Sequence, residues 1–347
     1  MRICWLSAVG LVFLGLHAYG ETKSSSGAVA TFPDHSSWHF EFSNDVFFLS
    51  DNNISNGMSF QYNSAAAQDW STMKGVPGFL RRLGRLVPAS SAKHIAHRFS
   101  LAVTQTLQTP DDLNRVDLIP EDVPYAGILT LQACWYAYDD TRFNALEATV
   151  GVVGSLSLAG QAQEAAHKLL KCTVPQGWDN QLPNEPLLNI SYLHKGKIWD
   201  TSVTDAAIAW NVTLGNYFTQ ASADIELRLG TNLPGGFLYV PDPICYNMHY
   251  QATLKPPRPD RCSLFGSLVF RGTALVHNIF LDGNLLRKSH SVDRKAMSGQ
   301  IVAGLHLTYR SWGIHLYASF STPLDYRDGD REDKKDRIGG FILEWRF

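Results

Sequence analysis

The chain has 347 residues, which is enough for one large domain or two ordinary ones. Only 18% of the residues are charged while 12% are aromatic, a balance that is low in charge and rich in rings for a soluble protein. The formal net charge of −2 gives no general attraction to nucleic acid, so we expect no nucleic-acid partner.

The beginning of the chain has the pattern of a secretory signal peptide, predicted to span residues 1–20. Arg2 supplies the positive start, residues 3–16 form the apolar core, and a small-x-small site ends it. We expect residues 21–36 to be a flexible segment and residues 37–347 to form one domain. After the signal, no stretch reaches the ~18 apolar residues that a membrane helix needs.

From residue 38 onward, apolar and aromatic residues alternate with polar ones in twelve segments, which is the pattern of half-buried strands. The last segment is aromatic and ends the chain at Phe347. The segments are 38–43, 58–63, 99–104, 129–136, 146–152, 188–192, 208–214, 225–229, 268–276, 301–309, 314–320 and 341–347.

This alternation fits two architectures, a soluble β-sandwich and a membrane barrel. The signal peptide, the segment lengths and the terminal Phe347 favour the barrel. A strand can cross lipid only if every backbone group is paired, and an even-stranded closed barrel achieves this. The sequence therefore predicts an all-β fold, a transmembrane antiparallel β-barrel of about twelve strands that is integral to a bacterial outer membrane.

One segment, residues 159–171, interrupts the strands with helical composition. Its Gln163 and His167 are four residues apart and share one helix face. If the chain starts in the periplasm, this helix belongs to the third outer loop. Folded over the barrel mouth, it lets His167 face Asp45 and Ser55, a group suited to general-base chemistry or to a hard cation. The alternative is a surface helix with a solvated histidine.

Two long connections lie on the opposite side of the predicted barrel. Residues 65–96 contain a basic and apolar stretch around Phe79 and Arg82, which predicts either an amphipathic helix at the inner leaflet or a solvated basic turn. The other connection is Pro-rich and carries Cys245, which we expect to form a disulfide with Cys262 in an oxidising compartment.

Five motifs carry a resemblance to a known family, because they recur in order and at compatible spacing. The set is similar to the lipid A 3'-O-deacylase family of outer-membrane barrels. The likeness covers roughly residues 38–192, and beyond them only the strand rhythm and Phe347 support it. The motifs are ND at 44–45, TQTLQTPDD at 104–112, PYAG at 124–127, GVVGSLSLAGQAQEAAH at 151–167 and GWDNQLPNEP at 177–186.

The resemblance implies a monomeric, calcium-dependent esterase that removes the 3'-linked acyloxyacyl chain of lipid A in lipopolysaccharide. Its active site would face the outer leaflet, between the barrel wall and the loop helix. By the family's pattern, His167 is the catalytic base and Gln163, Asn44, Asp45 and Ser55 complete the catalytic set. Ser55 stands where the family has a threonine, and it keeps the hydroxyl.

The phosphates of lipid A call for cations, and the expected substrate-binding residues are Arg115 and Lys168. Arg115 aligns with a family lysine, so the charge is kept but the geometry is not.

The expected cofactor is Ca²⁺, bound by Asp45, Ser55 and one more carboxylate. One member of the family has a glutamate six residues after the histidine, where this chain has Thr173. Glu185 is the favoured replacement and Asp179 the alternative.

Two other functions remain open on the sequence. An outer-membrane phospholipase would use Ser55 as its nucleophile. A non-enzymatic pore or adhesin is the second, although a pore needs an open polar lumen and twelve strands leave little room for one.

Overall fold

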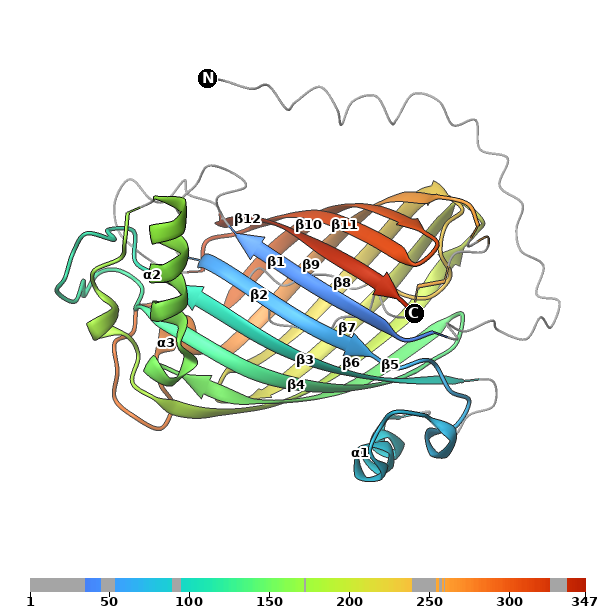
Figure 1. The fold of residues 1–347 in the computed structure, drawn as a ribbon, viewed down its shortest axis with the longest axis horizontal. Helices are drawn as coiled ribbons and strands as arrows, with labels where there is room; N and C mark the ends of the chain where they lie inside the picture. Colours follow the sequence, from blue (N-terminus) through green and yellow to red (C-terminus); the bar gives the residue numbers. More distant parts are fainter. Residues whose placement is uncertain are drawn as a thin grey trace, which may run out of the picture.

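Twelve antiparallel strands close into a single barrel, because β1 pairs with both β2 and β12 (Figure 1). The structure is a computed structural model that describes residues 35–44, 54–88, 95–171, 173–238, 254–255, 258, 260–324 and 336–347. The strands are β1 (Ser37–Asn44), β2 (Ile54–Asn63), β3 (Ala96–Gln108), β4 (Ala126–Tyr138), β5 (Arg142–Val153), β6 (Glu185–Asp200), β7 (Thr204–Gly215), β8 (Phe218–Thr231), β9 (Ser263–Asn278), β10 (Met297–Tyr309), β11 (Trp312–Ser321) and β12 (Asp336–Arg346).

The predicted fold class is confirmed, and the chain ends take part in closing the barrel. The amide of Phe347 donates to the carbonyl of Ser36 at 2.9 Å, and the amide of Ser36 donates back at 3.1 Å. The predicted signal peptide lies outside the described residues. Among those residues, no helix is both long and apolar enough to cross a bilayer.

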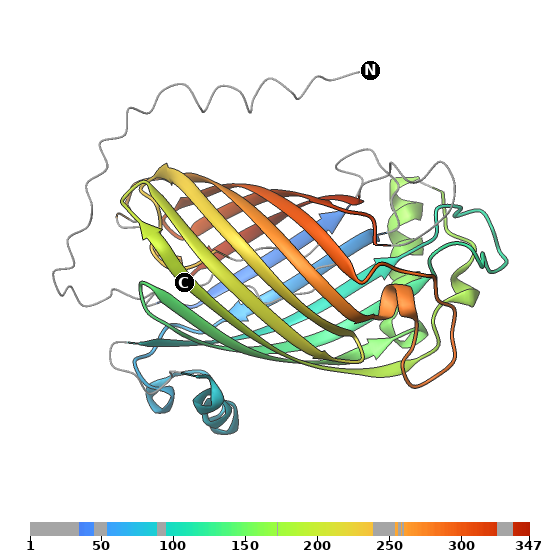
Figure 2. The same cartoon turned by 180° about the vertical axis from the view of Figure 1, so that it is seen from behind.

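Short helices lie at the two ends of the barrel (Figures 1 and 2). We call the end that carries α2 and α3 the helix end, and the end where Ser36 meets Phe347 the terminal end. The predicted helix over 159–171 is confirmed as α2. The helices are α1 (Gly78–Leu83), α2 (Ala159–Leu170) and α3 (Ile279–Asp282), with 3-10 turns η2 (Trp70–Thr72), η3 (Gly84–Leu86), η4 (Ser155–Ser157) and η5 (Trp178–Asn180).

The outer wall of the barrel is apolar and exposed, as the alternation predicts. The register pairs Phe60 with Val103, Val103 with Leu131, and Leu131 with Val150, so that large apolar side chains form a continuous row around the wall. All four side chains are exposed. Such a row is suited to contact with lipid tails, since every backbone group behind it is paired within the sheet.

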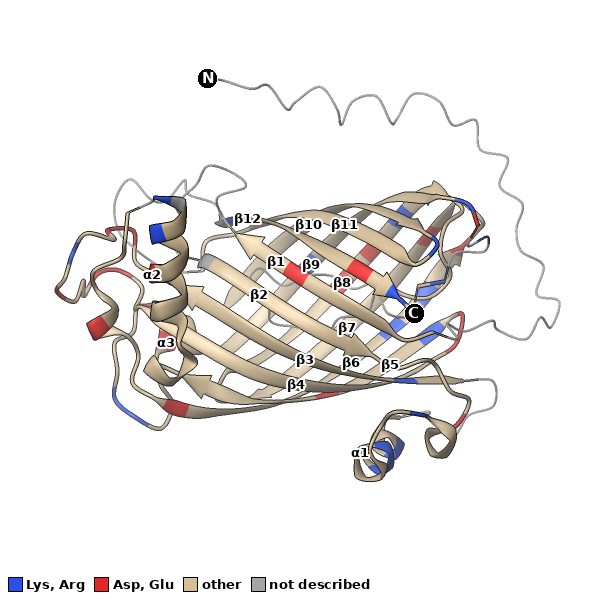
Figure 3. Cartoon of the chain, viewed as in Figure 1, with Lys and Arg blue, Asp and Glu red and all other residues tan. Residues whose placement is uncertain are grey.

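The inner face carries polar and charged side chains that neutralise one another. Figure 3 shows where acidic and basic residues occur along the strands. Arg228 makes two hydrogen bonds to the carboxylate of Asp205, and Arg271 bonds Asp224 at 2.9 Å. Lys195 is fully buried and pairs with Glu226. Because a charge removed from water needs a partner, these pairs explain how ionised groups are accommodated inside the barrel.

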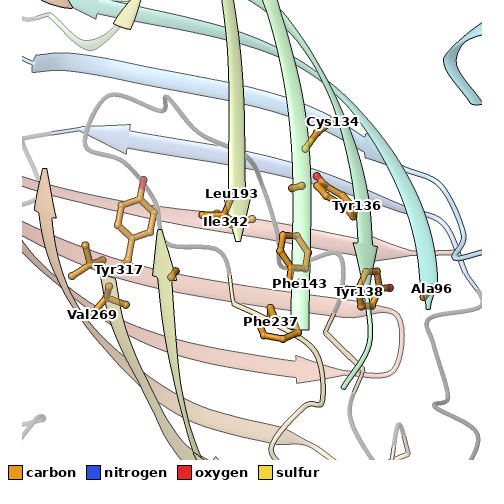
Figure 4. Close-up of a cluster of buried hydrophobic side chains, with 13 residues drawn as sticks. Ala96, Cys134, Tyr136, Tyr138, Phe143, Leu193, Phe237, Val269, Tyr317 and Ile342 are labelled. Atoms are coloured by element: carbon orange, nitrogen blue, oxygen red, sulfur yellow. The ribbon is translucent and has the colours of Figure 1, made fainter. Parts of the chain in front are cut away.

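Aromatic side chains and a connecting segment fill part of the lumen near the terminal end (Figure 4). Phe237, from the connection after β8, packs against Phe143 with 5.5 Å between ring centroids. The carbonyl of Leu238 accepts from Lys195 at 2.7 Å, and that of Gly236 accepts from Arg228 at 3.1 Å. Residues 233–238 therefore lie within the barrel, held by the same cations that pair with its carboxylates.

The described cysteines are Cys134, which is buried, and Cys262, which is exposed, and neither forms a disulfide within the described part of the chain. Cys245 lies outside the described residues, so its pairing with Cys262 stays a prediction.

Candidate active site

The loop that carries α2 packs on the outer wall of the barrel, at the ends of β3 and β4. Gln105 and Gly127 occupy outward positions on these strands. The Gln105 side chain donates to the carbonyl of Ser157 at 2.8 Å. A Cβ on Gly127 would lie 2.3 Å from the Cβ of Ala159, so the loop approaches the wall as closely as glycine allows. The structure therefore corrects the expectation that this helix covers the barrel mouth.

Two residues with positive φ bound the helix. Leu158 precedes it with φ 58°, and Lys171 ends it with φ 57°, where the Lys171 amide donates to the carbonyls of His167 and Lys168. α2 contacts β4 and β3, and it extends from β4 in the direction in which β2 and β1 follow β3 in the sheet (Figure 1). Its last turn, which carries His167, thus lies toward the side where β1 ends and β2 begins.

Gln163 is buried, and its hydrogen bonding fixes which way its amide points. The indole Nε1–H of Trp178 donates to Gln163 Oε1 at 2.9 Å. The Trp178 ring in turn packs on Tyr125, with 5.1 Å between centroids, and Gly160 leaves room for it. Because an indole can only donate, Oε1 must be the accepting atom, which leaves the NH₂ group of Gln163 as a donor for another partner.

His167 lies one turn further along and is half-buried, and its own contact fixes its tautomer. Nδ1 bonds the backbone carbonyl of Thr173 at 2.5 Å. A carbonyl only accepts, so Nδ1 carries the proton and Nε2 of the neutral ring keeps its lone pair. This is the form of histidine that can accept a proton from water. Thr173 contributes here through its backbone.

Polar residues at the end of β1 and at the start of β2 lie on this same side of the wall. Asn44 is the last residue of β1 and is half-buried. Since Ser43 pairs with Gly57, the register places Asn44 opposite Asn56 on the outer face. The Oδ1 atom of Asn56 is buried and has no hydrogen-bond partner among the described residues. An oxygen in this state is a ready acceptor or cation ligand.

Two of the predicted catalytic residues cannot be placed at this rim in atomic detail. Asp45 lies outside the described residues. Ser55 belongs to β2, next to the irregular pairing between Ile54 and Asn56, but its side chain also lies outside what the structure describes.

The structure does not favour Glu185 as a calcium ligand. Glu185 is fully buried on the inner side of the wall, whereas α2 lies on the outer side. Its Oε1 accepts from the side chain of Asn216 and its Oε2 from the amide of Leu286, both at 3.0 Å. These bonds tie two loops together at the helix end, so the role of Glu185 here is structural.

Asp179 is exposed in η5, directly after Trp178, and is thus on the same side as α2. It is the better candidate for the additional carboxylate. Among the described residues, no three His, Cys, Asp or Glu side chains gather closely enough to hold a metal ion by themselves.

The two predicted substrate-binding cations lie on the surface of the helix end. Arg115 is 3.9 Å from Glu121, and both side chains are exposed. Lys168 pairs with Glu164 at 2.5 Å, one turn earlier on α2. Exposed pairs of this kind are weak and readily exchange partners. Both cations are therefore accessible to an anionic ligand at this end.

Sequence reasoning missed two residues that the structure brings into the site, Trp178 and Gln105. Both stand inside motifs that carry the family resemblance. Their roles depend on contacts between segments far apart in the chain, such as the bond from Trp178 to Gln163, and composition alone gives no signal for these.

Comparisons with known proteins agree with this architecture. A family model described as "Outer membrane protein LpxR" matches residues 8–347. LpxR from Salmonella typhimurium is similar in structure, with a TM-score of 0.68 and 13% identity over 90% of this chain and 100% of that one. Comparison with curated protein sequences gives no match.

Two further solved barrels are less similar. The β domain of the Bordetella autotransporter BrkA gives a TM-score of 0.41 with 8% identity, covering 91% of this chain and 98% of that one. The translocator domain of NalP from Neisseria meningitidis gives 0.36 with 9% identity, covering 93% and 90%.

Proposed function

Because the chain belongs to the family of outer membrane protein LpxR, we propose that it is an outer-membrane esterase that removes the 3'-linked acyloxyacyl chain of lipid A. The observation that carries the proposal is the pair on α2. His167 has its proton on Nδ1 and a free lone pair on Nε2, and Gln163 one turn away has a fixed amide donor. This pair lies on the outer side of the wall of a membrane barrel, where lipids that contain esters can reach it.

The chemistry assigned to these residues is hydrolysis by an activated water. Nε2 of His167 accepts a proton as the water oxygen bonds to the ester carbon. The carbonyl oxygen gains negative charge, and the Gln163 NH₂ group would donate a hydrogen bond to it. When the bond to the sugar oxygen breaks, His167 returns the proton to that oxygen. General-base and oxyanion contributions each supply orders of magnitude in rate.

We propose that oxygen atoms on this side of the wall would bind a calcium ion. Ca²⁺ prefers several uncharged and carboxylate oxygens, and the unpartnered buried Oδ1 of Asn56 beside Asn44 is such an oxygen. We assign Asp45, Ser55 and Asn44 as further ligands, with Asp179 as the candidate for the additional carboxylate. When bound, the ion would supply positive charge to the ester oxygen as a Lewis acid.

Arg115 and Lys168 would recognise the phosphates of the substrate. Their present partners, Glu121 and Glu164, are exposed carboxylates that a phosphate can replace. The active site would face the outer leaflet, where lipopolysaccharide resides, and the protein would act as a monomer.

The test is mass spectrometry of purified lipid A after incubation with wild-type protein or His167→Ala, each refolded and verified by heat-dependent gel migration. Wild type should release the 3'-linked chain, and His167→Ala should lose at least about a hundredfold in rate. Excess chelator should stop the wild type, and Ca²⁺ should restore it better than Mg²⁺, whose strict octahedral shell suits such a rim poorly.

Full activity of folded His167→Ala would refute the proposed centre. Labelling of Ser55 by a serine-directed inhibitor would instead support the phospholipase alternative, and unchanged lipid A with wild type would remove the deacylase assignment altogether.

A further inference from the structure

The connection between β2 and β3 folds back onto the outer wall at the terminal end. We call its described part, residues 65–88, the basic segment. Its Trp70, Met73 and Val76 are buried against outward-facing Phe99 and Trp135. The backbone of Ala67 also pairs with that of His97. The basic segment is therefore a fixed part of the wall.

Two close contacts hold α1 in one orientation on this platform. The indole of Trp135 donates to the carbonyl of Leu80 at 2.8 Å. Gly84 lies so close to Trp70 that a Cβ there would be 2.4 Å from the indole ring. The face of α1 that carries Leu80 and Gly84 is thus turned toward the barrel, and the remaining faces are turned away from it.

An exposed apolar stripe lies beside the face that packs on the barrel. Phe79, Leu83 and Leu86 follow one another at spacings of four and three residues, and they are 65%, 41% and 66% exposed. At these spacings the side chains lie on one side of a helix. The stripe adjoins the lipid-facing surface, since Phe99 beneath the segment is followed two residues later on the same strand face by exposed Leu101.

Beside this stripe the segment is strongly basic. It contains Lys74, Arg81, Arg82 and Arg85, against the single carboxylate of Asp69. Arg81 is partly engaged in the fold, since it donates to the carbonyl of Ser71 at 2.6 Å. Arg82 and Arg85 are exposed. Figure 3 shows basic residues in blue on α1, which both ribbon views place beside the barrel at the end opposite α2.

We propose that the basic segment binds the anionic phospholipid headgroups of the leaflet at the terminal end, the inner leaflet of the outer membrane. The apolar stripe would enter the leaflet at the level of the first carbons of the acyl chains, where the barrel's own lipid-facing surface begins. The flanking arginines would bind phosphate oxygens, which a guanidinium matches well. This inference rests on the barrel and not on the proposed enzymatic activity.

Photocrosslinking of headgroups tests the proposal in the intact protein. The full chain is reconstituted in phosphatidylcholine vesicles that contain a small fraction of photoactivatable phosphatidylglycerol or phosphatidylcholine. Crosslinks on residues 65–88 are then quantified by mass spectrometry. Wild type should favour phosphatidylglycerol, and Arg82→Gln/Arg85→Gln should lose up to roughly fivefold of that preference per arginine at low salt.

Two comparison variants separate charge from burial and from general surface effects. Phe79→Ser/Leu86→Ser should lower the crosslinking of both lipids. Arg287→Gln/Lys288→Gln removes two exposed cations from the helix end and should leave the crosslinks on residues 65–88 unchanged. Heat-dependent gel migration verifies that each variant is folded.

Equal crosslinking of the two lipids in the wild type would overturn the proposal. So would an undiminished preference in folded Arg82→Gln/Arg85→Gln. Weak lipid crosslinking together with strong crosslinking of this segment to a periplasmic protein in cells would assign the surface to a protein partner instead.

Discussion

The indole of Trp178 fixes which way the side-chain amide of Gln163 points, and the effect of losing this bond on the rate can be measured. Trp178→Phe keeps an aromatic ring against Tyr125 but removes the donor to Gln163 Oε1. The amide can then rotate and present oxygen to the substrate. We expect kcat to fall about three- to tenfold with little change in KM, the value of one positioning hydrogen bond.

The matched control is Trp199→Phe, which removes an exposed indole whose bond to Thr204 lies far from α2. Gln163→Ala should lose at least as much as Trp178→Phe. The double variant should be no worse than Gln163→Ala alone, because both changes remove the same donor. Additive losses would contradict a role for Trp178 through Gln163.

The bond between Thr173 and His167 gives a second prediction about a single residue, because it is made by the backbone carbonyl of Thr173. Under the proposed mechanism, Thr173→Ala should leave the deacylation rate and the proposed calcium requirement unchanged, since the carbonyl remains. Thr173→Pro should lower the rate, because the rigid ring alters the turn that aims the carbonyl. Steady-state assays over a calcium titration check both. A raised calcium requirement in Thr173→Ala would mean that the hydroxyl is a ligand.

The contact between α2 and the wall depends on a glycine, which gives a prediction for this element. Gly127→Ala would place a Cβ 2.3 Å from Ala159, so the start of α2 must move outward. We expect a large loss of activity while the barrel still migrates as a folded species before heating. Gly272→Ala is the matched control, since a Cβ on Gly272 meets nothing within 4 Å. Equal activity of the two variants would show that the position of α2 is unimportant.

The elements themselves could be predicted well, and the reason is physical. Each strand separates lipid from a polar interior, so alternation is enforced along the chain and twelve segments could be recognised. The strands extend beyond the alternating segments at the helix end. There β3 continues through Leu107, whose outward side chain is buried under protein. The pattern of lipid-facing residues therefore does not extend this far.

The site could be predicted only in part. His167 and Gln163 share a face because helical spacing alone dictates it. The side of the wall on which Glu185 falls depends on the register of β6, and a shift of one residue reverses it. The sequence therefore favoured a carboxylate that the fold turns inward. The aim of the Gln163 amide likewise depends on Trp178, fifteen residues further along.

At the scale of the whole molecule, the filled interior argues against the pore hypothesis. Ion pairs such as Arg228 with Asp205 on the neighbouring strand line the inner face, and Phe237 with its neighbours lies within the lumen. Side chains and a connecting segment therefore occupy part of the space that an open pore would need.

Because α2 rests on the outer wall, a lipid can reach it by lateral movement within its own leaflet and never has to leave the membrane. The encounter rate is then set by how crowded the two-dimensional surface is with substrate. Diluting lipid A with inert detergent at constant bulk concentration should slow the enzyme in proportion to the falling mole fraction. Adding more mixed micelles of unchanged composition to a saturated assay should leave turnover per enzyme the same. A rate that followed bulk concentration alone would place the reacting ester in water.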